Sequence, residues 1–320
     1  MKNKRGFEFS FGWLFSIIVG TVIIFLAIYA SMKLVQTENK IRDSEIGKQL
    51  GIILNPIETG IEEGKSDKIV LQSETRLYNK CLASGTFGVQ EIRIATKSGI
   101  GEKWPNPGVP SSFNNKYIFS SDIVEGKEYR IFAKPFEMPF KIADLIYMWP
   151  INEEYCFINP PGEIEDEVND LGLGINVSNS ITECSKKSKK VCFTSSGCDI
   201  DVSLGIGNEL RGSVTKKENF ISNKVYFEKT ELLYGAIFAS PEMYDCQIKR
   251  LTGRGAELAL LYGSKSVFLS VKGCGSNLDS DLKNYANKSL AVKNSLDLRE
   301  ISAISDNIRR VNEDLLCRLF

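Results

Sequence analysis

The 320-residue sequence contains no histidine, and this absence removes several classes of enzyme. Ser-His-Asp triads and Cys-His pairs need an imidazole to activate their nucleophile, and H-E-x-x-H zinc hydrolases bind their metal through two. Acid–base chemistry by carboxylates, lysine or tyrosine is still open to the chain. No pair of such residues is marked out by its spacing, so we expect a protein that is not an enzyme and that needs no cofactor.

Net charge is also absent, because 40 Lys and Arg residues balance 40 Asp and Glu residues. A chain without a global positive field has no long-range attraction to the phosphates of a nucleic acid. The eight cysteines include no C-x-x-C pair, which is the usual spacing of thiolates at a zinc site. We therefore expect neither nucleic acid nor a metal ion among the partners of this protein.

Charged residues are missing from one long stretch near the N-terminus, Phe9–Met32, which is dominated by Phe, Ile, Val, Leu and Ala. A helix needs about 20 apolar residues to cross the hydrocarbon core of a bilayer, and a buried core helix rarely runs so far without a polar break. The stretch predicts one membrane-spanning helix over about residues 9–32, which makes the lipid bilayer the first expected partner.

A cleaved secretory signal is the main alternative, with cleavage after Ala30 and Ser31 as the new first residue. The apolar run is longer than the usual signal core of about 7–15 residues, and no A-x-A site follows it. We therefore predict a single-pass protein of the cell membrane that keeps its anchor.

The orientation of the anchor is predicted from the cysteines, because Lys and Arg residues flank both ends of the span. All eight cysteines follow the span, as do the N-x-S sequons at Asn176 and Asn287. Disulfides and glycosylation both belong to the oxidising side of a membrane. The N-terminus is expected in the cytoplasm and the body outside it.

Residues 1–62 are expected to form the span and then an amphipathic stalk helix. Beyond Lys33 apolar residues recur three to five positions apart, the helical period, with polar residues between them. These apolar residues are Leu34, Ile41, Ile46, Leu50, Ile53, Ile57 and Ile61. Pro56 is expected to kink or end the helix, because proline lacks a backbone N–H.

Residues 63–239 are expected to form a β-rich extracytoplasmic domain, because short β-prone runs alternate there with Gly, Pro, Asn and Ser. One short helix is predicted near GEIEDEVNDLG, which starts at Gly162. The clearest strand is CDIDVSL, from Cys198 to Leu204, with its apolar residues on one face and its aspartates on the other. This alternation is typical of a half-buried antiparallel strand.

Residues 240–320 are expected to form an α-helical hairpin, which completes an α+β fold. Ser240 and Pro241 are suited to cap and begin the first helix, and Gly273 to end it. The second helix carries a seam at three- and four-residue spacing that consists of Ile301, Ile304, Ile308, Val311 and Leu315. An intermolecular coiled coil needs a longer heptad run, so we expect this seam to pack within its own domain.

Two antiparallel helices of equal length would bring Cys246 level with Cys317, so we predict a disulfide between them. Cys184, Cys192 and Cys198 lie close together in the sequence, and one bonded pair is expected among these three. Zinc is the alternative for the trio, but the spacing of its thiolates fits a zinc site poorly.

The segment Lys4–Glu8 enters the apolar run with two basic residues, a glycine, an aromatic residue and an acid. This order resembles the N-terminus of type IV pilin-like subunits and of TadE-like assembly proteins. The resemblance implies cleavage after Gly6, with Phe7 as the new first residue, and a role for Glu8 in neutralising a neighbour's amino terminus during assembly. In pilins that glutamate is the fifth residue after cleavage, whereas Glu8 would be the second. On physical grounds alone, Glu8 is expected among lipid headgroups beside Arg5.

A second segment, LLYGAIFASPEMYDCQIKR from Leu232, resembles uncharacterised archaeal single-pass membrane proteins. The leading hypothesis is a non-catalytic, membrane-anchored cell-surface protein: a plain anchored body, or a pilin-like or envelope-assembly component that contacts other subunits or further copies of itself. The alternative is an extracytoplasmic module that binds a ligand or partner in a pocket of its β-rich body. A hydrolase with two facing carboxylates is the third hypothesis.

Overall fold

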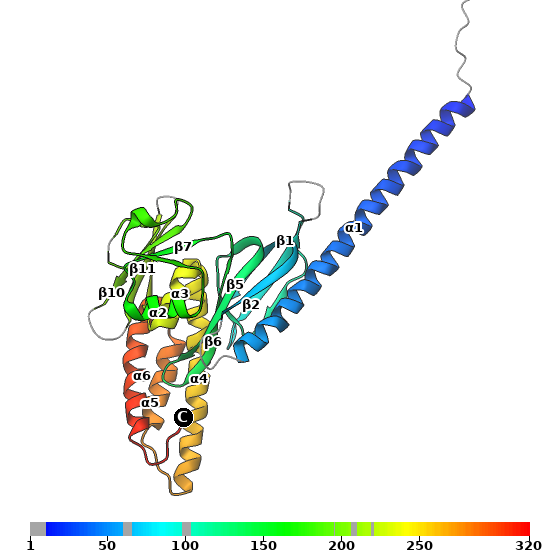
Figure 1. Ribbon diagram of the computed structural model, residues 1–320. Coiled ribbons are helices and arrows are strands. Elements are labelled where there is room, and N and C mark those ends of the chain that lie inside the picture. Colours follow the sequence, from blue (N-terminus) through cyan, green and yellow to red (C-terminus); the bar gives the residue numbers. More distant parts are fainter. Residues whose placement is uncertain (1–10, 60–65, 98–103, 195, 206–209, 219–220) are drawn as a thin grey trace, which may run out of the picture.

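A computed structural model describes residues 11–59, 66–97, 104–194, 196–205, 210–218 and 221–320. A single long helix, α1 (Phe11–Thr59), leaves the body toward its own N-terminal end, and two sheets form the middle of the molecule (Figure 1). The remaining long helices extend from the sheets away from the start of α1. The predicted mixture of helix and sheet, with a long apolar N-terminal helix and a β-rich body, is confirmed. Pro56 does not end α1, which continues for three more residues.

The first sheet has six strands in the order β3-β2-β1-β5-β6-β4. Its strands are antiparallel, except that β4 runs parallel to β6. They are β1 (Ser66–Leu82), β2 (Val89–Thr96), β3 (Ser111–Phe113), β4 (Tyr117–Phe119), β5 (Ile123–Glu137) and β6 (Lys141–Pro150).

The first sheet must curl, because its two edge strands are neighbours in the sequence. Only residues 114–116 join β3 to β4, and four Cα steps reach at most about 14 Å. Six strands laid flat would place those edges about 24 Å apart. The curl gives the sheet a concave side, which holds a core cluster of ten aliphatic residues and Tyr129 from its own strands. It also leaves a seam where the two edges approach each other.

Arg250 of helix α4 (Pro241–Val271) fills that seam. Its guanidinium donates hydrogen bonds to the backbone oxygens of Phe87 at 3.1 Å, Asn114 at 3.0 Å and Lys116 at 2.7 Å. It also stacks over the ring of Tyr117, 4.6 Å from the centroid. Burial lowers the pKa of Arg250 to about 10, so the side chain is still charged at neutral pH. The guanidinium also lies 3.4 Å from the backbone oxygen of Phe113, so this one side chain contacts both edge strands, β3 through Phe113 and β4 through Tyr117.

The second sheet also has six strands, in the order β12-β11-β10-β9-β7-β8. They are β7 (Tyr155–Ile158), β8 (Asn176–Ser178), β9 (Lys189–Cys192), β10 (Ile200–Leu204), β11 (Arg211–Glu218) and β12 (Ile221–Glu228). The predicted strand is β10, which is antiparallel to β11 but parallel to β9. Ile200 and Val202 are buried, as predicted. Asp201 was expected to face solvent, but it is buried as well.

An aromatic core joins the two sheets and their helices. The predicted short helix is α2 (Gly162–Asp170), and a second one, α3 (Thr230–Phe238), is buried from Leu232 to its end. The ring of Phe238 stacks on that of Trp149 with centroids 4.4 Å apart. Close approach of α3 needs Gly235, because a Cβ there would lie 2.6 Å from the ring of Phe119. The most apolar helix of the body is thus enclosed on all sides.

Three helices form the C-terminal segment, where a two-helix hairpin was predicted: α4, α5 (Asp279–Leu290) and α6 (Leu298–Glu313). As predicted, Ser240 caps α4, accepting a hydrogen bond from the Met243 N–H at 3.2 Å, and α4 stops just before Gly273, whose φ is +85°. Helix α5 lies between the two helices that were predicted and reverses the chain once more. The seam residues of α6 pack against the main core of the same chain, so the intramolecular prediction is confirmed.

The extra reversal explains why the predicted Cys246–Cys317 disulfide is wrong. Cys317 lies beside the far end of α4, where it pairs with Cys274 at a Cα separation of 5.8 Å. Cys246, near the start of α4, pairs instead with Cys81 at the end of β1, with Cα atoms 6.0 Å apart. Cys192 pairs with Cys198, and Cys184 pairs with Cys156. All eight cysteines therefore lie in four pairs at bonding distance.

We expect Arg250→Met to lower the free energy of unfolding by about 3–5 kcal/mol, because it leaves buried backbone oxygens at the seam without donors. The thermal midpoint of the full chain in detergent, followed by circular dichroism, should fall by roughly 10 °C. The control is Arg254→Met, one turn later on α4, where the side chain is half-exposed. It should shift the midpoint by less than about 2 °C. Equal effects of the two substitutions would contradict the role of Arg250 at the seam.

Candidate functional site

The N-terminal helix α1 contacts the body where its C-terminal half packs against the first sheet. In the C-terminal half of α1 a narrow face is buried, and its members recur at the helical period. They are Asp43, Gly47, Leu50, Gly51 and Leu54. We call these five residues the seat. This half of α1 contacts β2 and β3, at the edge of the curled sheet.

Leu50 and Leu54 provide the apolar part of the seat. Both are buried in the core cluster on the concave side of the first sheet, together with Leu77, Ile92 and Ile94. Burying a leucine side chain stabilises a fold by about 1.5–3 kcal/mol relative to leaving it exposed. Helix α1 therefore completes the core of the first sheet.

Two glycines let α1 approach the sheet closely. A Cβ on Gly51 would lie 2.2 Å from the Phe113 ring of β3, and one on Gly47 would lie 3.0 Å from the Ser111 hydroxyl. Glycine costs a helix about 1 kcal/mol relative to alanine. Here it permits a contact that a side chain on the helix would block.

Asp43 fixes the register of the helix on the sheet. Its carboxylate is buried, with 1 % of the residue exposed, and accepts hydrogen bonds from the hydroxyl and backbone N–H of Thr96, at 2.6 and 3.3 Å. Next to it, the Ser44 hydroxyl accepts a bond from the Val109 N–H at 2.9 Å. Sliding or rotating α1 would leave the Asp43 carboxylate buried without donors, which costs several kcal/mol. The helix is thus held in one position and one rotation.

The buried face is rotated from the one that the sequence pattern predicted. Ile41 belongs to the predicted apolar stripe but is 63 % exposed, whereas Asp43 is buried. Apolar spacing alone cannot detect a seat that contains an aspartate and two glycines. The four-residue spacing of Gly47 and Gly51 was the available signal, because it marks a helix face without side chains.

Among the described residues, the N-terminal half of α1 contributes no side chain to the core of the first sheet. By length and composition, the helix is apolar enough over Phe11–Ile52 to cross a membrane. Its most apolar stretch has a mean hydropathy of 2.5, and none of that stretch is buried in the described part of the chain. Trp13 and Tyr29 lie near the two ends of the apolar run, and both are exposed. The predicted processing and assembly residues Gly6, Phe7 and Glu8 lie outside the described residues.

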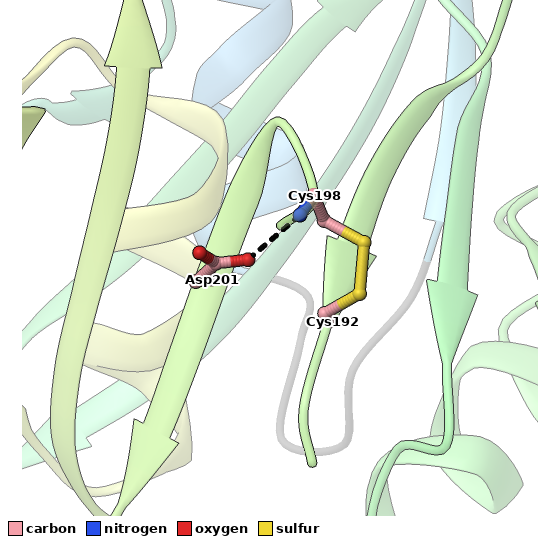
Figure 2. Close-up of side chains that lie close together, drawn as sticks. All are labelled: Cys192, Cys198 and Asp201. Atoms are coloured by element: carbon pink, nitrogen blue, oxygen red, sulfur yellow. Dashed lines mark hydrogen bonds between the residues drawn. A yellow bond between two sulfur atoms is a disulfide. The ribbon is translucent and has the colours of Figure 1, made fainter. Parts of the chain in front are cut away.

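Cys192, Cys198 and Asp201 offer metal-ligand atoms within 4.8 Å of one another. Figure 2 shows that the two sulfurs are bonded to each other, while the carboxylate of Asp201 faces the Cys198 backbone N–H. A bonded sulfur is not a thiolate ligand. The carboxylate accepts hydrogen bonds from the N–H groups of Cys198 at 3.0 Å and Gly197 at 3.1 Å, and it pairs with Lys217. These contacts assign the cluster a structural role at a tight turn.

The electrostatics of Asp201 agree with that role. Burial acts to raise the pKa of its carboxyl, but hydrogen bonds from Lys217 and from the N–H groups of Gly197 and Cys198 outweigh it and lower the pKa below the usual value. The charged form therefore stabilises the fold.

The acidic run on α2 also has structural partners. Glu167 pairs with Lys134 of β5 through one carboxylate oxygen and accepts a hydrogen bond from the Tyr234 hydroxyl of α3, at 2.8 Å, through the other. Burial, and then the charge of Glu167, raises the pKa of Tyr234. Both oxygens are engaged in tying α2 to the first sheet and to α3. This arrangement suits a tether between elements better than an acid or base of a hydrolase.

Comparison with known proteins found no matching family model, no similar curated protein and no similar solved structure. Function is therefore inferred from the residues and geometry of this chain alone.

We expect Gly51→Ala to destabilise the seat by about 1–3 kcal/mol, because the new methyl group must displace the Phe113 ring. Hydrogen exchange of the α1 amides near residue 50 should become faster in the full chain. Gly20→Ala is the matched control on the same helix, since nothing lies within 4 Å of its Cβ position. It should leave exchange at the seat unchanged. Faster exchange in both variants, or in neither, would contradict a tight seat.

Acid should remove the contribution of Asp201 to stability. Because its pKa is lowered in the folded chain, this contribution is present above about pH 4 and is lost as the pH falls through the lowered pKa. We expect Asp201→Asn to cost about 1 kcal/mol at pH 7 and to make the thermal midpoint less sensitive to acid between pH 5 and pH 2. Asp199→Asn, at a more exposed carboxylate, is the control. An unchanged acid sensitivity in Asp201→Asn would refute the assignment.

Proposed function

We propose that this protein is a non-catalytic, membrane-anchored surface protein that holds its β-rich body at a fixed position and rotation relative to the anchor. The observation that carries this proposal is the division of α1 into two halves. The N-terminal half is apolar and exposed, whereas the C-terminal half is built into the core of the first sheet. One unbroken helix therefore joins whatever covers its apolar half to the folded body.

The length of the apolar half of α1 matches the thickness of a lipid bilayer, which would bury its exposed side chains. Residues 11–32 rise about 33 Å as a helix, close to the hydrocarbon thickness of about 30 Å. Trp13 and Tyr29 are of the type that lies at the two membrane interfaces. Between the span and Asp43 the helix carries Lys33, Lys40 and Arg42, whose side chains are exposed. This part rises about 15 Å, enough to clear the headgroups before the body begins.

The cysteines and sequons support an extracytoplasmic body. Four pairs of cysteines at bonding distance suit an oxidising compartment. The side chains of Asn176 and Asn287 are exposed, as acceptors of a glycan must be. The N-terminus is then on the cytoplasmic side.

A second way to bury the apolar half of α1 is an assembled filament or envelope complex. In such an assembly the apolar halves of neighbouring α1 helices would bury one another, and Glu8 would meet the amino terminus of a neighbour after cleavage before Phe7. The rigid seat favours this role equally, because an ordered array needs every body at the same rotation about its helix. The resemblance of residues 4–8 to pilin-like and TadE-like N-termini supports it.

The mature N-terminus separates these cases. We expect the full chain to stay in the membrane fraction after alkaline carbonate extraction, and intact-mass spectrometry to find Met1 or Phe7 as the first residue. Phe7 would identify a processed, assembly-type subunit, and Met1 a plain anchor. A soluble product that begins at Ser31 would overturn the proposal, because the span would then have been a secretory signal.

A further inference from the structure

The C-terminal half of α4 carries an apolar face that the described part of the chain leaves exposed. The members of this face are 44–80 % exposed and recur at three- and four-residue spacing, so they share one side of the helix. They are Leu260, Leu261, Val267, Phe268 and Val271. We call these five residues the α4 stripe. The opposite side of the same turns is buried against the body, through Ala259, Gly263 and Ser266.

The α4 stripe is larger than the scattered apolar residues of an ordinary protein surface. With roughly 200 Å² for a large apolar side chain, the exposed fractions leave about 600 Å² of apolar area on one copy. Contiguous exposed patches of this size mark interaction sites. Two such faces would bury about 1,200 Å² in total, which is the lower limit for a specific protein–protein interface. A second copy of the stripe is therefore large enough to be the partner.

The position of the α4 stripe argues against the bilayer that would hold α1. Helix α4 extends from the sheets away from the start of α1, and it reaches farther from the sheets than α5 and α6 do (Figure 1). The stripe lies on this projecting end. Lipid around the N-terminal half of α1 would therefore not cover it, and a protein surface is the more suitable partner.

An antiparallel pair of α4 helices makes the stripe complementary to itself. Ser264 lies at the centre of the stripe, is exposed, and is small enough to let two helices approach closely. With a twofold axis at Ser264, Leu260 of one copy lies opposite Phe268 of the other. Leu261 likewise lies opposite Val267. The symmetry repeats each of these contacts, so the four side chains of each copy are covered by those of its partner.

The charges at the two ends of the stripe favour the same arrangement. Glu257 is exposed three residues before the stripe begins, and Lys272 follows it directly, with Nζ 5.9 Å from the centroid of the Phe268 ring. Antiparallel packing places Glu257 of each copy beside Lys272 of the other, whereas parallel packing would place each charge beside its own kind. Arg254 lies one turn closer to the body, opposite a position past the end of the second helix.

A groove of about 350 Å³ at the body end of the stripe leaves room for the end of the second helix. Glu257 and Leu261 of α4 line this groove, together with Phe87 and the two asparagines at 114 and 115. Val271 is the most exposed member of the stripe, at 80 %, and in the antiparallel pair it lies opposite Glu257. The groove therefore receives Val271 of the second copy.

We propose that the α4 stripe is a self-association surface, through which two copies of this chain pair with their α4 helices antiparallel about Ser264. Turning α4 end for end also turns α1, so the two anchors leave the pair in different directions. Such a pair joins copies on two facing membranes rather than neighbours in one. The pairing goes beyond the anchoring role and does not depend on what covers α1, whereas the joining of two membranes rests on the proposed anchor.

Sedimentation of the full chain in detergent tests the pairing over about 1–200 μM. We expect the protein mass to rise from that of one chain, 35.7 kDa, toward that of two. Phe268→Glu places a charge in the stripe without touching the core, so the dissociation constant should increase at least tenfold. Val109→Glu adds the same charge outside α4, at a side chain that is 67 % exposed, and should pair as the unmodified chain does. A single chain throughout the range, or unchanged pairing in Phe268→Glu, overturns the proposal.

Charge reversal tests the direction of the two helices. Glu257→Lys brings two lysines together at each end of an antiparallel pair, so it should weaken pairing at least about fivefold. Adding Lys272→Glu to the same chain should restore the dissociation constant to within about twofold of the original. In a parallel pair, Glu257→Lys would only exchange one like-charge contact for another. A double variant as weak as the single one contradicts the antiparallel arrangement.

Vesicles test the joining of membranes. Vesicles that carry the full chain with its body outside should cluster, as measured by light scattering, and vesicles that carry Phe268→Glu should stay dispersed. If the unmodified chain pairs in detergent but leaves its vesicles dispersed, the facing arrangement is wrong. Failure of the proposed anchor is distinguishable, because the chain would then not be retained in the vesicles at all.

Discussion

Three residues between two edge strands set the shape of this protein. The link over residues 114–116 is too short to cross a flat six-stranded sheet, so the sheet curls and gains a concave side and a seam. Both the concave side and the seam must be packed with side chains from other elements. Arg250 fills the seam with hydrogen bonds to the backbone oxygens of Phe87, Asn114 and Lys116, which lie outside the strands. Leu50 and Leu54 from α1 complete the core on the concave side. The curl therefore determines where both long helices, α1 and α4, must lie.

The seat of α1 joins a helix that is exposed and apolar at one end to a folded core at the other. The buried leucines stabilise the packing of α1 on the sheet, and the glycines let the helix approach the sheet closely. Asp43 fixes the position of α1 along the sheet, because its carboxylate meets hydrogen-bond donors in only one position. A flexible tether would need none of these. A body held by such a seat moves with its helix as one unit. This rigidity is useful to an anchored surface protein, and it is a requirement for an ordered assembly.

The helix α4 does more than close the seam. It carries Cys246, which is bonded to Cys81 of β1, and Gln247, which joins Arg250 to Gln90 of β2 through buried hydrogen bonds. The same turns of one helix thus fix the positions of β1 and β2 relative to α4.

Features that depend on local or compositional physics could be predicted from the sequence. A run without charge predicts an apolar helix, Ser240 and Pro241 predict the start of α4, and the alternation in β10 predicts a strand with Ile200 and Val202 inside. The partners of the cysteines depend on how the chain folds. Helix α5 adds a reversal that the sequence pattern did not mark, so Cys317 lies beside Cys274 and not beside Cys246. Cys246 pairs with Cys81, 165 positions away. Asp43 and Arg250 are charged residues that look solvated in the sequence, because the groups that bind them, Thr96 for Asp43 and the backbone oxygens of Phe87, Asn114 and Lys116 for Arg250, are distant along the chain. Burial of a charge is decided by such matches, and those exist only once the chain has folded.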